Sequence, residues 1–217
     1  MVLIAVTGEA STSLAAERAT AHLRVEATGA DRADVVARAA HRHAELLDQA
    51  RTHVASGAAT GWEAQDVTTG TVHEWVEGDG DRHRQRLFRA TANVRVHVVD
   101  VAVLGSWLLE VGAQEDVAVD HVSWDLTEVT RTAAVENLRV RAVRDAVARA
   151  ATYAGALGLT TPRLTAVYED GLRPGGPGGG PVPMMAMRAV AHDGGGGLEL
   201  QPQDVELTVT VSADLEA

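Results

Sequence analysis

The sequence predicts an α+β protein in which three helices pack on one face of an antiparallel or mixed β-sheet. Several segments alternate apolar and polar residues, as strands do when one side of their sheet is buried and the other meets water. Three other segments repeat apolar residues at intervals of three to four, the spacing of a helix with one buried face. Parallel strands of nucleotide-binding folds are buried on both sides, so these polar faces disfavour a Rossmann-type fold.

The strands are predicted from this period-two alternation. A short alternation over residues 122–126 leads into the third helix. Residues 62–99 predict a long hairpin, because the Asp-Gly step within residues 77–81 supplies residues that adopt positive φ readily. The three clearest alternating segments are residues 21–28, 92–98 and 205–212.

The helices are predicted from apolar spacing and from residues that suit helix ends. Asp34 is placed to help cap the first helix, and Gly158 suits the C-terminal cap of the third. The third helix carries a stripe of small side chains that allows close approach to a sheet: Leu138, Ala142, Ala146, Ala150 and Ala154. The predicted bounds are Asp31 and Gly57 for the first helix, Asp100 and Gly112 for the second, and about Arg131 and Leu157 for the third.

Residues 171–197 differ in composition, because they are rich in Gly and Pro and end in four consecutive glycines. Such a segment buries too little apolar area to offset chain entropy, so we expect a long Gly/Pro/Met loop before the final strand. Within it, Met184, Met185 and Met187 form a candidate contact loop, since flexible thioethers suit an adaptable binding surface. The alternative is that these methionines pack the loop against the core.

The composition limits the possible functions. The 217 residues, 46% of them hydrophobic, suffice for a full core. We expect one domain over residues 1–217, or two closely joined lobes with the hairpin 62–99 between them. A formal charge of -11 disfavours nucleic acid and anionic membranes as partners. The chain has no Cys and no Lys, which excludes disulfides, thiol nucleophiles, Schiff bases and a P-loop lysine.

The N-terminal residues show no signal-peptide pattern, and no segment is apolar for long enough to cross a bilayer. We therefore expect a cytoplasmic chain.

Several local strings occur together in a recognisable order. They are residues 6–10 (VTGEA), 88–90 (FRA), 122–126 (VSWDL), 141–146 (RAVRDA), 155–158 (GALG) and 183–187 (PMMAM). In this order they resemble the SIMPL-domain family, a widespread bacterial group of largely unknown function. The resemblance spans essentially the whole chain. It implies an α+β fold with helices on one face of a sheet, a tendency to self-assemble, and no known catalytic residues.

No motif predicts catalysis, a cofactor or a metal. On the first helix, only His41 and Glu45 have the one-turn spacing of a helical ligand pair, and without further ligands this pair favours a solvated polar face over a metal site. Ser106 lacks the second glycine of a nucleophile elbow and sits inside a predicted helix.

The candidate interaction face comes from the polar positions of the alternating strands. If these strands are neighbours, Arg, His and carboxylate side chains gather on one surface that could contact another subunit or hold a small anion. The alternative is a merely solvated face. The candidate residues are His22, Arg24, Glu26, Arg95, His97, His121 and Asp125.

We therefore expect a non-enzymatic protein that acts through self-assembly or protein contact, with a homo-oligomer as the expected state. The alternative is a small-ligand or metal-binding protein that uses the same His and Arg residues.

Overall fold

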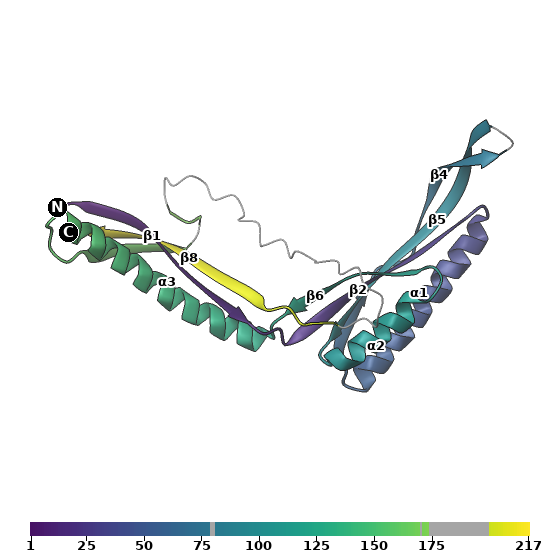
Figure 1. Cartoon of the computed structure of the whole chain (residues 1–217), viewed down its shortest axis with the longest axis horizontal. Coiled ribbons are helices and arrows are strands. Elements are labelled where there is room, and N and C mark those ends of the chain that lie inside the picture. Colours follow the sequence, from purple (N-terminus) through teal and green to yellow (C-terminus); the bar gives the residue numbers. More distant parts are fainter. Residues whose placement is uncertain (79–80, 170, 174–199) are drawn as a thin grey trace. The chain divides into compact units, whose positions relative to one another are not determined.

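The computed structural model of this chain describes residues 1–78, 81–169, 171–173 and 200–217, with the backbone alone at 76–78 and 81–83. The chain divides into two compact units. One unit is built from Met1–Ala15, the segment that begins at Leu126, and the final segment from Asp204. The other is built mainly from Ala16–Asp125. We call them the three-stranded unit and the five-stranded unit, after their sheets (Figure 1).

The three-stranded unit is an antiparallel sheet with one helix on it. Strands β1 (Leu3–Leu14) and β8 (Val205–Glu216) pair along their whole length, and β7 (Arg163–Glu169) pairs with the other side of β8. Helix α3 (Glu128–Ala156) packs on one face of this sheet. The bounds of strand β7 were not predicted from the sequence.

Helix α3 lies unusually close to strand β1. The predicted stripe from Leu138 to Ala154 is buried, which confirms its role as the sheet-facing side. At Gly8, an added Cβ atom would lie 2.1 Å from the main-chain oxygen of Ala142 and 2.8 Å from Cβ of Ala146. Only glycine leaves room for the helix backbone here. Gly158 has a φ of 66° beyond the end of α3, as the predicted C-terminal cap requires.

The five-stranded unit contains the longer sheet, and all its strand pairs are antiparallel. The strand order is β3-β5-β2-β6, and β4 pairs with the outer part of β5. The predicted hairpin is present, since β4 and β5 pair up to Gly78 and Asp81. The strands are β2 (Arg18–Gly29), β3 (Ala59–Ala64), β4 (Thr68–Gly78), β5 (Asp81–Val98) and β6 (Val117–Asp125).

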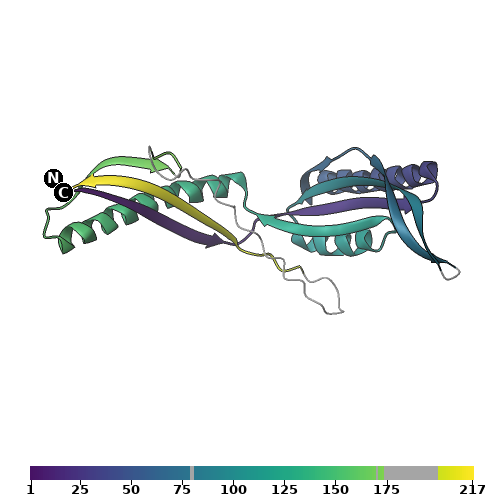
Figure 2. The ribbon, with the colours of Figure 1, turned by 90° about the horizontal axis from the view of Figure 1, so that it is seen from above.

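Two helices cover one face of the five-stranded sheet. Helix α1 (Arg32–Ala55) buries Val35 and Leu46 among others, and helix α2 (Val101–Gly112) buries Leu104 and Trp107. The side chain of Asp31, not that of Asp34, caps α1, because its Oδ1 accepts the main-chain N–H of Ala33 and of Asp34. The side chain of Asp100 caps α2 in the same way. Figure 2 views this sheet from the side away from both helices.

The α+β class and the antiparallel strand pairing are therefore confirmed, with the three helices divided between two sheets. The alternation of apolar residues reveals which face of a strand is buried, but it does not reveal which strands pair. The predicted Gly/Pro/Met loop falls mostly on residues 174–199, so Met184, Met185 and Met187 lie outside the described residues. No described helix is both long enough and apolar enough to span a membrane.

Candidate functional site

The site is the side of the five-stranded sheet opposite α1 and α2, which we call the polar face. Strand β2 lies at its centre, between β5 and β6. On β2, the residues on the helix side are buried from Ala19 to Ala27, while the alternate residues on the polar face are partly or fully exposed. All seven candidate residues lie on this face, on three adjacent strands: His22, Arg24, Glu26, Arg95, His97, His121 and Asp125.

Two imidazole rings stack at the centre of the polar face. His22 lies directly opposite His121 on β6, and their ring centroids are 4.0 Å apart at an interplanar angle of 14°. Nε2 of His22 is also 3.0 Å from the hydroxyl oxygen of Ser123. Partial burial lowers the pKa of His22 below its ordinary value of 6.5, and the charges of His121 and Arg95 lower this pKa further, against an opposing effect of Asp120. This arrangement therefore favours the neutral ring.

Strand β3 adds a carboxylate next to Arg95 and His97. The Glu63 carboxylate lies 3.4 Å from Nη1 of Arg95 and 3.5 Å from Nε2 of His97. Nδ1 of His97 forms a 3.0 Å hydrogen bond with the hydroxyl of Thr20. Since the side chains of Arg95 and Glu63 are 52% and 62% exposed, their long contact is weak and open to competition.

Arg24 is held more firmly than Arg95. Its guanidinium lies 3.1 Å from Oε2 of Glu26 and 3.1 Å from Oδ1 of Asp120. Glu26 also contacts Arg89 on β5 at 3.4 Å. Two carboxylates already neutralise this part of the face, so Arg24 is less available to an incoming anion than Arg95.

Asp125 lies at the other end of the polar face. Its Oδ2 atom accepts a 2.9 Å charge-assisted hydrogen bond from Arg18, the residue opposite it on β2.

A bulge in β6 explains why Asp120 was absent from the predicted set. The register shifts by one residue at the His22/Leu23 step of β2, so Asp120 has no partner of its own on that strand. The bulge lets Val119 and Val122 both face the core while Asp120 reaches Arg24. The sequence holds a hint of this irregularity, because the spacing from Val119 to Val122 breaks the period of two. Glu63, Ser123 and Arg18 were also missed, since their contacts depend on which strands pair.

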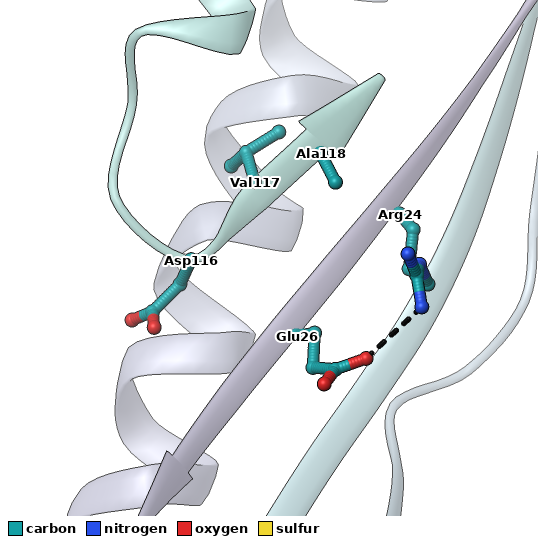
Figure 3. A pocket seen from close by; sticks show the side chains of 5 residues that line it. All are labelled: Arg24, Glu26, Asp116, Val117 and Ala118. Carbon is teal, nitrogen blue, oxygen red and sulfur yellow. Dashed lines mark hydrogen bonds and ion pairs between the residues drawn. The ribbon is translucent and has the colours of Figure 1, made fainter. Parts of the chain in front are cut away.

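A shallow depression of about 310 Å³ lies at one end of the polar face (Figure 3). It is lined by Arg24, Glu26, Asp116, Val117 and Ala118. Figure 3 shows Glu26 turned toward Arg24 along β2. Asp116 has a φ of 63° and contacts Arg38 of α1 at 3.3 Å. Because every charged group of this lining already has a partner of opposite charge, the depression offers little to a charged ligand.

The described residues contain no group of three or more His, Asp or Glu side chains that could hold a metal ion. His41 and Glu45 are 3.2 Å apart on α1, and Arg42 binds the same carboxylate at 2.8 Å. The hydrogen bond from Arg42 lowers the pKa of Glu45, with His41 adding to the effect. Ser106 donates its hydroxyl to the main-chain oxygen of Val103 within α2. These contacts are those of solvated helix faces.

Comparison with protein families gives one result that covers nearly the whole chain. The model of the SIMPL family, described as "Protein of unknown function (DUF541)", matches residues 4–215. No curated protein matches the chain.

Proposed function

The chain belongs to the SIMPL family, and because that family has no assigned function, we propose from its own surface that it is a non-enzymatic protein-contact module. The polar face of the five-stranded sheet is the contact surface, and a second copy or another protein is the partner.

The main observation in support is the strand register. It places the two stacked rings of His22 and His121 beside Arg95, at the centre of the face opposite α1 and α2. Guanidinium groups make bidentate contacts with carboxylates, and imidazole rings offer flat surfaces with a polar edge. A protein partner that carries carboxylates would find both at this position.

The weak internal ion pairs favour exchange with a partner. Arg95 and Glu63 are largely exposed and 3.4 Å apart, so little free energy is lost when the pair separates. A carboxylate of the partner could replace Glu63 as the ion-pair partner of Arg95, and a cation of the partner could then pair with Glu63. Charged groups of both signs on one surface also help to select the correct orientation of a partner.

The test replaces Arg95 and His97 with alanine together. We expect the double variant to lower the molar mass of assembled protein, measured by light scattering during size-exclusion chromatography, while circular dichroism shows a folded chain. The same measurement at high salt should weaken wild-type assembly, because exposed charges are screened. Arg141→Ala with Arg144→Ala is the matched control, since both residues are exposed on α3.

One outcome would overturn the proposed surface, and another would narrow the partner. Unchanged assembly in the Arg95/His97 variant would remove the polar face as the contact surface. A monomeric wild-type chain at low and high salt would exclude self-assembly and leave contact with another protein as the remaining form.

A further inference from the structure

A second surface lies on the hairpin of β4 and β5, away from the polar face. Its outer described part consists of residues 71–75 and 84–88, which we call the hairpin arm. Strand β5 is the only described element with which β4 makes extensive contact. In Figure 1 the arm extends past the start of α1. A two-stranded ribbon by itself is only marginally stable in water, so an arm of this length gains from a partner that covers it.

The strand register gives the arm two different faces. Trp75 lies opposite Arg84, and His73 lies opposite Arg86. Residues that are directly opposite in an antiparallel pair share a face. Farther along β5, the even-numbered residues such as Ala90 are buried on the helix side of the sheet. The face with Trp75 therefore continues the core side of the sheet beyond the cover of α1.

This face has the composition of a binding hot spot. Trp75 is 69% exposed, the largest exposed aromatic side chain in the described chain. The guanidinium of Arg86 lies 5.2 Å from the centre of the Phe88 ring. Arg84 and Arg86 form no ion pair within the described part of the chain. Trp and Arg are the residues most enriched among those that carry binding energy.

Charge indicates what covers the arm. His73, Arg84 and Arg86 share this face, while Glu74 points to the other face opposite Gln85. The chain as a whole carries a formal charge of -11, so a second copy has a net negative charge that attracts this cationic face. We propose that the Trp75 face of the hairpin arm docks on an acidic surface of a second copy of this chain.

The experiment measures the dimer dissociation constant by sedimentation over a concentration series. Trp75→Ala should raise this constant about tenfold or more, as expected for a central aromatic anchor. Tyr153→Ala is the matched control, because Tyr153 is an exposed aromatic residue on α3. Arg84→Ala with Arg86→Ala should also weaken the dimer and reduce its dependence on salt, whereas Arg141→Ala with Arg144→Ala should not.

A second measurement does not depend on any variant. Hydrogen exchange at residues 71–75 should slow as the wild-type concentration rises through the dissociation constant, because docking covers the arm.

The outcomes separate this proposal from the role of the polar face. Loss of the dimer in Trp75→Ala but not in the Arg95/His97 variant supports the arm and overturns the polar face as the surface of self-assembly, and the reverse result overturns the arm. A wild-type chain that stays monomeric at all concentrations, with unchanged exchange in the arm, overturns the proposal.

Discussion

The two units share one plan, an antiparallel sheet with helices on one face, but they use the other face differently. On the three-stranded sheet, the uncovered face carries hydroxyl side chains, such as Thr7 opposite Ser212, and carboxylates, such as Glu9 and Asp214. On the five-stranded sheet, the corresponding face carries stacked histidines, arginines and carboxylates. The stacked histidine pair is thus found on one of two similar scaffolds, whereas carboxylates occur on both.

The covered faces differ as well. In the three-stranded unit, α3 approaches so closely that Gly8 meets the helix backbone. In the five-stranded unit, α1 and α2 meet the sheet through larger side chains such as Leu46 and Trp107. Helix–sheet packing in the three-stranded unit therefore depends on the absence of a side chain at Gly8. Packing in the five-stranded unit depends on large side chains that fill the space between helix and sheet.

The largest effect is expected from a substitution that disrupts the close packing of the three-stranded unit. Gly8→Ala should lower the free energy of unfolding by about 3 kcal/mol or more, because the new methyl group would overlap the main-chain oxygen of Ala142. Urea unfolding followed by circular dichroism measures the loss, and hydrogen exchange over α3 locates it.

The five-stranded unit supplies the control for this substitution. Gly61 on β3 has no atom within 4 Å of an added Cβ, so Gly61→Ala should change stability by less than about 0.5 kcal/mol. Equal losses at Gly8 and Gly61 would contradict the difference in packing between the two units.

A smaller effect concerns pH and the polar face. Burial, then the charges of His121 and Arg95, lowers the pKa of His22 in the folded chain below its ordinary value of 6.5. The unfolded chain then binds more protons than the folded chain as the pH falls below about 6.5. The contribution of His22 to the free energy of unfolding is therefore fully present above about pH 6.5. It decreases as the pH falls from 6.5 to the lowered pKa of the folded chain, and it stays constant at lower pH.

The measurement is the free energy of unfolding at several pH values between 7.5 and 5, in steps of about half a unit. His22→Gln should flatten the fall in stability on the acid side, whereas His73→Gln on the hairpin arm, whose ring is exposed, should leave it in place. An unchanged slope in His22→Gln would show that the stacked pair does not favour the neutral ring.

The smallest expected effect concerns small ligands. We expect divalent metals and common anions to shift the melting temperature by less than about 1 °C, because a ligand stabilises a protein only by binding its folded state. A clear rise with one metal or anion, lost in the Arg95/His97 variant, would favour the alternative of a ligand-binding protein.

Much of the fold could be predicted from the sequence, because local patterns determine local structure. The bounds of α1 and α2 follow from Asp31 and Asp100 before them and from the glycines near their ends. Helix α3 begins at Glu128, three residues before the predicted start, because Thr127 caps it. The division into two sheets could not be predicted, since strand pairing joins residues as distant as Leu3 and Glu216.

The candidate site could likewise be predicted from the sequence only in part. Period-two alternation was enough to place His22, Arg95 and His121 on the same side of their strands. The partners Glu63 and Asp120 required knowledge of the neighbouring strand and of a bulge.

The bulge at Asp120 also makes the length of β6 as important as its composition. Removing Asp120 would restore strict alternation and leave Val117, Val119 and Val122 all facing the core, but Arg24 would lose one of its two carboxylate partners on the polar face. A one-residue gap in a related sequence at this point would therefore mark a different surface, even where every histidine and arginine remained. In comparisons of such sequences, the number of residues in β6 would therefore indicate the chemistry of the polar face better than the identity of its residues.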